Sequence, residues 1–236
     1  MSPGDELVRD EWPGDESIGD LLRGDIWRSE IFRGDKRDSL RSSLEEKPLP
    51  VVAHIFIRIF KLERELELWA RQGSRFELIR IYPICYFSGQ LGPKLREGDE
   101  QTPEGFYFVT PEQLNPNSRF HLSFNIGYPN RYDRAHGWTG AAIMVHGNCV
   151  SIGCFARTDP VIEELYQMAE AAFAGGQPFF RVHVFPFRMD STNMALFAGS
   201  GWEEFWYNLK DGYDLFERER RPPNVIVTAR RYEFEE

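Results

Sequence analysis

The stretch VVAHIFIRIF, residues 51–60, alternates apolar with other side chains over the length of one β-strand. ELELWAR at 65–71 and RFELIRIYPIC at 75–85 follow it, each after a short polar turn. The intervening residues 72–74, Gln-Gly-Ser, are of the types that form a hairpin loop. We therefore predict that the folded part of the chain begins as an antiparallel meander.

Further strands are expected along the rest of the chain. They are FYFVT (106–110), HLSFNIGY (121–128), AAIMVH (141–146) and RVHVFPF (181–187). The Gly-rich stretch from Ser88 to Gly105 is predicted to be an extended loop, because glycine and proline interrupt any regular pattern in it. The fold class that follows is predominantly β with attached helices, an α+β fold.

Two helices are predicted in the second half. Asp159 can cap a helix that has Pro160 at its first position, and the Gly-Gly pair at 175–176 ends it. The expected apolar face of this helix consists of Val161, Ile162, Leu165, Met168, Ala169, Ala172 and Phe173. The aromatic-rich stretch 201–219 predicts a final amphipathic helix, so the domain gains its helices late in the chain.

Length and composition limit the classes of protein. The chain has 236 residues, of which 42% are hydrophobic, enough for one catalytic domain over 51–236 with a C-terminal helical extension. The formal net charge of −9 argues against a general nucleic-acid binder, which needs a basic surface. No stretch approaches the roughly 18 apolar residues of a membrane span, and residues 1–30 show no secretory signal.

The N-terminal region is repetitive. Residues 2–41 divide into four ten-residue units in which Gly-Asp recurs. Such short, charged units cannot close a hydrophobic core, so residues 1–50 are expected to be a disordered or marginally helical tail. The tripeptide Arg-Gly-Asp occurs at 23–25 and 33–35, but so short a string in a charged repeat is more often chance than an adhesion signal.

Three cysteines, Cys85, Cys149 and Cys154, give the first chemical clue. An odd number cannot pair within one chain, so at least one is free, metal-bound or joined to another molecule. Zinc is a weak interpretation, because Cys149 and Cys154 lack the short spacing of a zinc knuckle and only His146 lies near them. We therefore expect neither a metal site nor a cofactor.

The segment IMVHGNCVSIGC, residues 143–154, carries the candidate chemistry. A thiol of ordinary pKa is only a few per cent thiolate at neutral pH, so a nucleophilic cysteine needs a nearby base, and His146 is the nearest candidate for Cys154. A strand ending at His146 and a hairpin returning to Cys154 would bring the two together. The alternative is that Cys149 and Cys154 are ordinary core thiols beside a satisfied histidine.

Two glycines in this segment favour the catalytic interpretation. Gly147 and Gly153 permit a tight return of the chain. Gly153 also lets a substrate carbonyl approach closely, so the backbone N–H of Cys154 with a neighbouring amide could form an oxyanion hole.

The same segment resembles the active-site signature of YkuD-type L,D-transpeptidase catalytic domains, in which His-Gly is followed by Ser/Thr-His-Gly-Cys. The wider chain resembles the YafK branch of that family more closely. The matching blocks are CYFSGQLGPKLREGDEQTPEGFY (85–107), NIGYPNRYDRAHG (125–137), MVHGNCVSIGC (144–154), VFPFRM (184–189) and PPNVIV (222–227). They run in order along the chain and are highly specific together, whereas His-Gly or Gly-Cys alone is a weak signal.

The resemblance implies a YkuD-like β-sandwich or meander fold and a substrate in the stem peptides of peptidoglycan. By position, Cys154 would be the nucleophile, His146 the general base and Gly153 part of the oxyanion turn. Ser151 matches the Ser/Thr of the signature and could orient His146, or it could equally be a turn hydroxyl bonded to nearby backbone. Ile152 stands where the wider family has a second histidine, which argues against a mechanism that uses two histidines.

The resemblance also implies a reaction. A thioester would form at the L-centre of meso-diaminopimelate and pass to water or to an amine, either cleaving the amide between a lipoprotein and peptidoglycan or forming a cross-link. Because that substrate carries carboxylates, we expect cationic side chains at the cleft. The candidates are Arg134, His136, Arg157 and Lys94.

The resemblance implies a periplasmic or cell-envelope location, although residues 1–50 contain no export signal. Two other functions stay open at this point. The chain could be an inactive wall-binding or interaction module with the repeats as its contact surface. It could also be an effector delivered into a neighbouring cell's envelope.

Overall fold

A five-stranded sheet forms the centre of the computed structural model, which describes residues 42, 44–45, 54–149 and 153–235. Its strands are β1 (Ile55–Phe60), β2 (Glu65–Gln72), β3 (Arg75–Pro83), β4 (Gly105–Val109) and β9 (Phe180–Phe185), in the order β3-β2-β1-β9-β4. The strands β1, β2 and β3 form the predicted antiparallel meander. The sheet is not antiparallel throughout, because β9 pairs parallel with β1 after a crossover of more than one hundred residues.

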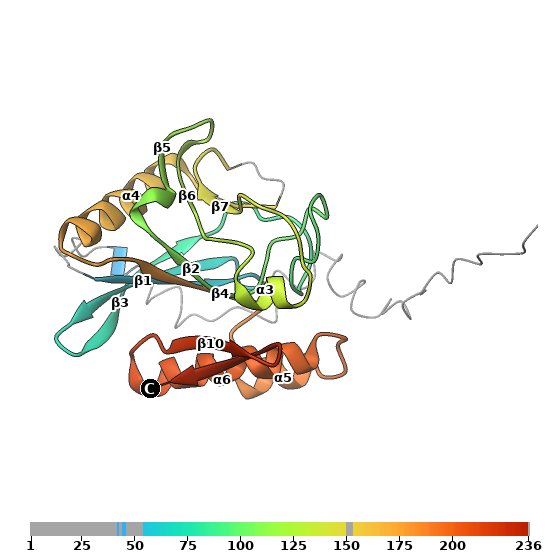
Figure 1. Cartoon of the computed structure of the whole chain (residues 1–236). Coiled ribbons are helices and arrows are strands. Elements are labelled where there is room, and N and C mark those ends of the chain that lie inside the picture. The colour runs from blue at the N-terminus through green and yellow to red at the C-terminus, as the bar shows by residue number, and fades with distance from the viewer. Residues whose placement is uncertain (1–41, 43, 46–53, 150–152, 236) are drawn as a thin grey trace, which may run out of the picture. The chain divides into compact units, whose positions relative to one another are not determined.

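A second sheet of four strands lies beside the first (Figure 1). Its order is β5 (Leu114–Ser118), β6 (His121–Asn125), β7 (Met144–His146) and β8 (Phe155–Ala156). Sequence reasoning missed β5, because three of its five residues LNPNS are polar and none of the five is fully buried. β6 pairs antiparallel with β7, whereas β7 and β8 are parallel.

Among the described residues from 54 onward, the helices are η2 (Pro111–Gln113, a 3-10 turn), α3 (Arg131–Ala135), α4 (Asp159–Ala174), α5 (Ser191–Leu196) and α6 (Glu203–Glu219). The predicted helix after the cysteine segment is α4, but its N-cap is Thr158 and Asp159 lies in its first turn. Its buried side chains include Ile162, Leu165 and Ala169. They pack on the second sheet, so α4 is held firmly behind β6 and β7.

One hydrophobic core joins the two sheets and α4. Alternate residues of β1 enter it, among them Ile57 and Ile59, together with Val145 of β7 and Leu165 of α4. The other residues of β1 point to the opposite face, where Phe56 packs on Phe216 of α6. Every residue of β1 is therefore buried, because the five-stranded sheet is covered on both faces.

The C-terminal segment covers that second face. α6 is followed by a hairpin of β10 (Asn224–Thr228) and β11 (Arg231–Glu235), drawn in orange and red in Figure 1. The predicted C-terminal extension thus contains a β-hairpin as well as helices. Arg58, buried in β1, forms an ion pair with Glu67 at 2.7 Å and reaches Glu217 of α6, which ties this layer to the sheet.

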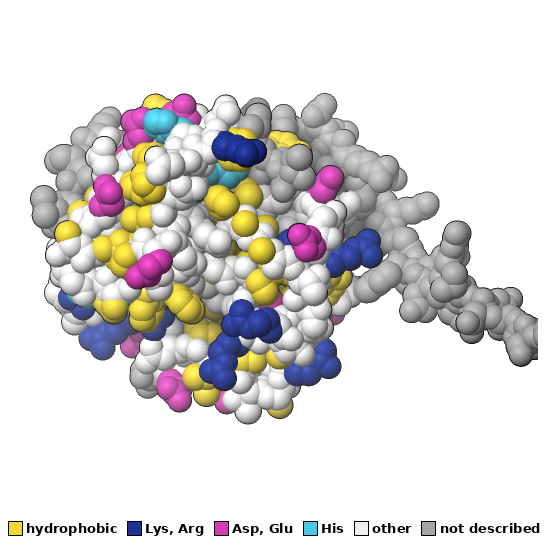
Figure 2. Space-filling model, turned by 45° about the horizontal axis from the view of Figure 1, so that its top comes forward, with side chains coloured by type: hydrophobic (Ala, Val, Ile, Leu, Met, Phe, Trp, Pro, Cys, Tyr) yellow, Lys and Arg dark blue, Asp and Glu magenta, His cyan; other side chains and the backbone are white. Residues whose placement is uncertain are grey.

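The described residues lie in a unit that spans Leu40–Glu236, and the predicted tail at 1–50 falls almost wholly outside the described residues. On the face drawn in Figure 2, basic side chains are interspersed with carboxylates and apolar groups. Among the helices of the described part, none is long and apolar enough to cross a membrane.

Candidate active site

The candidate site is built on the parallel pair β7–β8. His146 is the last residue of β7, and Cys154 directly precedes β8. Val145 pairs with Phe155, and the backbone N–H of Arg157 donates to the carbonyl of His146 at 2.8 Å. The chain does return to β7 as expected, but by a loop between parallel strands rather than a hairpin. The backbone is left-handed at Asn148, Cys149 and Gly153, which allows sharp turns within this short connection.

Cys154 is a free cysteine with a partly exposed side chain. Its Sγ accepts a hydrogen bond from the backbone N–H of Met144 at 3.4 Å and lies 3.7 Å from the carbonyl oxygen of Ala142. The thiol is therefore held against the first residue of β7, the strand that ends at His146. A sulfur with a backbone N–H directed at it is better able to carry negative charge.

His146 is 2% exposed, and its Nδ1 lies 2.6 Å from the carbonyl oxygen of Gly147. A carbonyl only accepts, so Nδ1 carries the proton and the lone pair of the neutral ring is on Nε2. Burial lowers the pKa of His146, and the hydrogen bond to Gly147 partly opposes this shift. The ring of Phe120 lies over the imidazole with centroids 4.6 Å apart. The result is a neutral, oriented imidazole that can accept a proton through Nε2.

The turn after His146 is fixed by the start of α4. Asp159 Oδ1 accepts a hydrogen bond from the backbone N–H of Asn148 at 2.8 Å. A Cβ on Gly147 would lie 2.6 Å from that same oxygen and 2.8 Å from the carbonyl oxygen of Phe120. Glycine is therefore required here by close packing. Asp159 was predicted as the helix cap, but it lies in the first turn of α4 and holds the loop that carries the site.

Gly153 has a φ of +100°, which only glycine adopts readily, in agreement with a tight turn before the nucleophile. Its N–H donates to the hydroxyl oxygen of Ser88. Ser88 is buried, and its carbonyl accepts from the backbone N–H of Thr102 at 3.3 Å. Because the N–H of Gly153 is already engaged, Gly153 would shape the oxyanion turn rather than donate to a substrate. Sequence reasoning missed Ser88, although it lies in the quoted block 85–107.

The loop that carries Ser88 is anchored by a buried ion pair. Lys61 Nζ lies 2.9 Å from Glu104 Oε1, and both side chains are fully buried. Lys61 also donates to the carbonyl oxygens of Gly92 and Thr102, while the second oxygen of Glu104 accepts from Trp206 of α6. A buried pair with this many hydrogen bonds fixes one geometry, so the predicted extended loop 88–105 is an ordered wall of the site.

Cys85 and Cys149, whose pairing the sequence left open, form a disulfide with Cα atoms 5.4 Å apart. It joins the segment after β3 to the loop between His146 and Cys154. Backbone hydrogen bonds support it on both sides, from Cys85 N–H to Ala156 and from Cys149 N–H to Arg157. All three cysteines are thus accounted for, and Cys154 is the one left as a thiol.

Two of the predicted substrate-binding cations lie on or beside α3. Arg134 is exposed and donates to the carbonyl of Pro129. His136 places its Nδ1 2.9 Å from the carbonyl of Tyr132 and stacks on that ring at 4.1 Å. Arg134 is therefore engaged by the residue before the N-cap of α3 and His136 by a residue within it, and the role of both in binding stays a prediction.

The other two predicted cations are buried. Lys94 is 5% exposed and forms an ion pair with Asp99. Arg157 has no exposed surface and donates to the carbonyl of Tyr82 at 3.2 Å, while burial lowers its pKa to about 9. Both side chains are thus engaged inside the protein, and their role in substrate binding stays a prediction. Ser151 and Ile152 lie outside the described residues, so their predicted roles are not tested.

A domain of two sheets and a packed helix, with a free thiol beside a strand that ends in a buried neutral histidine, defines the class. The family model of the L,D-transpeptidase catalytic domain, YkuD, matches residues 55–184, and the chain belongs to this family. It is 46% identical over 199 residues to the protein named "Putative L,D-transpeptidase YafK" of Escherichia coli strain K12, covering 84% of this chain and 81% of that protein. The protein of the same name in Escherichia coli O157:H7 matches equally well.

Solved structures show more distant likeness. The K307A mutant of the helical cell shape determining protein Pgp2 from Campylobacter jejuni has a TM-score of 0.47 at 20% identity, covering 76% of this chain and 62% of that one. Pgp2 itself gives 0.45 at 18% identity, covering 81% and 80%. Bd1075 of Bdellovibrio bacteriovorus gives 0.40 at 20% identity, covering 70% and 56%.

Proposed function

We propose that this chain is a peptidoglycan-acting cysteine enzyme in which Cys154 is the nucleophile and His146 the general base. The observation that carries the proposal is that the Cys154 thiol and the neutral imidazole of His146 lie on neighbouring strands, with Cys154 directly before β8 and His146 at the end of β7. Membership of the L,D-transpeptidase family supports a substrate in peptidoglycan. Two further features support the same site. The disulfide fixes the loop between His146 and Cys154, and the Lys61–Glu104 ion pair fixes the loop 88–105.

The proposed reaction begins at the amide on the L-centre side of meso-diaminopimelate. Nε2 of His146 takes the proton of the Cys154 thiol as the sulfur attacks the amide carbonyl. The carbon–nitrogen bond then breaks, His146 gives the proton to the departing amine, and a thioester remains on Cys154. Backbone N–H groups at the turn after Gly153 would stabilise the negative oxygen of the intermediate.

The second half of the reaction depends on what attacks the thioester. Water would release a carboxylate and regenerate the thiol, which amounts to cleavage of the amide between an anchored lipoprotein and peptidoglycan. An amine of a second stem peptide would instead give a cross-link. We place hydrolysis first because of the resemblance to the YafK branch, and we place the enzyme in the cell envelope, where both substrates would be found.

The test is incubation of the purified chain with peptidoglycan sacculi that carry attached lipoprotein, in parallel with Cys154→Ala and His146→Gln. Released protein and muropeptides are read by mass spectrometry, and circular dichroism confirms that each variant is folded. Release of lipoprotein or new cross-links only with the intact thiol supports the proposal and names the acceptor. Identical products from the parent and a folded Cys154→Ala chain would refute Cys154 as nucleophile and favour a binding module.

A further inference from the structure

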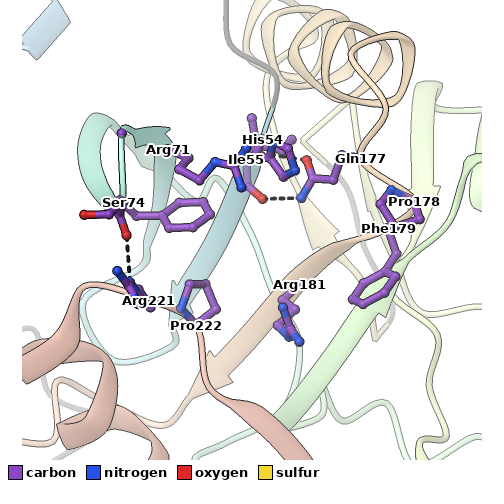
Figure 3. Close-up of a pocket in the computed structure, with 12 residues that line it drawn as sticks. His54, Ile55, Arg71, Ser74, Gln177, Pro178, Phe179, Arg181, Arg221 and Pro222 are labelled. Carbon is purple, nitrogen blue, oxygen red and sulfur yellow. Dashed lines mark hydrogen bonds between the residues drawn. The ribbon is translucent and has the colours of Figure 1, made fainter. Parts of the chain in front are cut away.

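A cavity of about 430 Å³ lies at the edge of the five-stranded sheet, and neither Cys154 nor His146 lines it. The lining residues come from the starts of β1, β3 and β9, the end of β2 and the segment after α6, as Figure 3 shows. They include the cations Arg71, Arg181 and Arg221, the rings Phe76 and Phe179, and the polar residues His54, Ser74 and Gln177. No aspartate or glutamate of the described part of the chain lines the cavity.

The charge of this cavity is unusual for the chain. The protein has 37 acidic and 28 basic residues, and most buried or half-buried arginines elsewhere pair with carboxylates. Among the described residues, Arg71, Arg181 and Arg221 form no ion pair with a carboxylate, so three positively charged side chains line the cavity without a paired carboxylate. Unpaired cations around one cavity repel each other, and an anion between them would remove that repulsion.

Neutral contacts hold two of these arginines in place without neutralising them. Arg221 donates from Nε to the carbonyl oxygen of Ser74 at 2.7 Å, as the dashed line in Figure 3 marks. Arg181 donates to Asn224 Oδ1 at 2.7 Å, and its guanidinium lies 5.2 Å from the ring centroid of Phe179. Each guanidinium keeps further N–H donors that these bonds do not use.

The back of the cavity is rigid. Gln177 accepts from the backbone N–H of Ile55 at 2.8 Å and donates to the carbonyl of Ile55 at 2.9 Å. This paired bond locks the start of β1 against the segment before β9. The cavity is thus a preformed site in which fixed donors and apolar rings line one space, the arrangement that binds an organic anion.

The cavity and the thiol lie at opposite ends of β3. Ser74 and Phe76 are at its start, whereas Cys85, beyond its end, donates to the carbonyl of Ala156, two residues after Cys154. Nine residues of extended strand cover roughly 27–30 Å. One ligand that occupies both sites must therefore be long and extended, with anionic groups well away from the bond that reacts.

We propose that this cavity is a second, non-catalytic site that binds a carboxylate of an extended anionic polymer. The proposal rests on the proposed function in taking that polymer to be peptidoglycan, whose stem peptides carry carboxylates. A stem peptide distant from the reacting one would sit between the three arginines, with its apolar portions against Phe76 and Phe179. Such a contact would hold the enzyme on the wall between successive reactions.

The test compares binding to sacculi by co-sedimentation, in a Cys154→Ala background so that no turnover disturbs the measurement. The variants are Arg71→Gln alone and the triple change Arg71→Gln, Arg181→Gln, Arg221→Gln. The control removes as many charges elsewhere, through Lys210→Gln, Arg230→Gln and Arg231→Gln. Arg71 is exposed and forms no ion pair, so its single variant is expected to fold even if the triple variant does not.

We expect the triple variant to bind sacculi at least about tenfold more weakly and Arg71→Gln to show part of that loss, with the control unchanged. With Cys154 intact, both variants should still process a small soluble muropeptide at the parental rate.

Equal loss in the control, or no loss in the arginine variants, would overturn the proposal. A parallel assay measures binding to phosphatidylglycerol vesicles. If the arginine variants lost binding to these vesicles but kept binding to sacculi, the proposal would also be overturned. Absence of turnover with the intact thiol would refute the proposed function but leave the binding comparison valid.

Discussion

The hydroxyl of Ser88 accepts a hydrogen bond from the backbone N–H of Gly153, the residue before the free thiol of Cys154. This bond joins the ordered loop 88–105 to the turn that would form the oxyanion site. A serine at the edge of one loop thereby fixes the backbone of another, 65 residues away in sequence. Its importance should be visible in catalysis more than in stability.

We expect Ser88→Ala to lower kcat by about ten- to a hundredfold, because a loosened turn misplaces the sulfur and its neighbouring N–H donors. The cost in free energy of unfolding should be only about 1–2 kcal/mol, because one hydrogen bond is lost and one buried N–H is left unpaired. Turnover of sacculi and urea denaturation measure the two effects.

Ser88→Thr keeps the hydroxyl and is the matched variant, expected to retain most of the activity. A Ser88→Ala chain with parental kcat would show that the hydrogen bond to Gly153 has no role in positioning the turn.

Much of the fold could be predicted from the sequence, because β1, β2, β3 and α4 bury regular apolar patterns. β5 and β8 could not, because one is mostly polar and the other has two residues. Their strand character comes from neighbours in the sheet and not from their own side chains. The parallel pairing of β1 with β9 depends equally on contacts that are distant in sequence.

The part of the candidate site that lies within one short segment of sequence could be predicted. His146, Gly153 and Cys154 follow one another in a short segment, so their proximity could be inferred from sequence. Ser88 could not be identified as a partner of Gly153, because only the tertiary fold brings the two together. The burial of Arg157 was equally invisible, because only the tertiary fold brings this side chain to the carbonyl of Tyr82.

The pH dependence of activity should report His146. Burial lowers its pKa below the ordinary value of about 6.5, and a general base acts only when unprotonated. We therefore expect kcat/KM to be constant near neutral pH and to fall only as the pH drops below about 6.5. The check is a profile of kcat/KM from about pH 4.5 to about pH 8 in steps of about half a unit, with a soluble muropeptide as substrate. The values are corrected for any unfolding at the acidic end.

His146→Gln should lose about a hundredfold or more of kcat/KM and with it this acid limb. The control is His136→Gln, which removes another imidazole that stacks on Tyr132 and should leave the limb in place. If the limb persisted in a folded, partly active His146→Gln chain, another group would have to be the base.

Protein stability should depend on pH through His183. This ring is 1% exposed among Phe56, Phe106 and Phe185, and neither of its nitrogens has a hydrogen-bond partner among the described residues. Burial, with Arg181 and Arg58 nearby, lowers its pKa well below 6.5, so the unfolded chain binds a proton that the folded chain does not. The free energy of unfolding should therefore fall as the pH drops below about 6.5, by up to about 1.4 kcal/mol per pH unit from this group.

Urea denaturation at several pH values checks this effect, with His183→Phe as the informative variant and His121→Gln as the control. His183→Phe keeps an aromatic ring among its neighbours and removes the titrating group, so its stability should fall less steeply in acid. His121 is exposed and lies 2.7 Å from Glu163 on the surface, so its variant shows what the loss of a surface histidine alone does to the slope. Equal slopes for all three chains would exclude His183 as the source.

The disulfide between Cys85 and Cys149 should stabilise the fold and the site together. It closes a loop of 64 residues, and bridges of this kind contribute about 2–4 kcal/mol, mainly by restricting the unfolded chain. Because Cys149 lies in the loop between His146 and Cys154, its removal should also loosen that loop. We expect Cys85→Ser with Cys149→Ser to lower the Tm and to lower kcat more than a surface substitution of equal destabilisation would. A thiol count of the denatured, unreduced parent chain should give one free thiol, and a count of three would show that the bridge does not form.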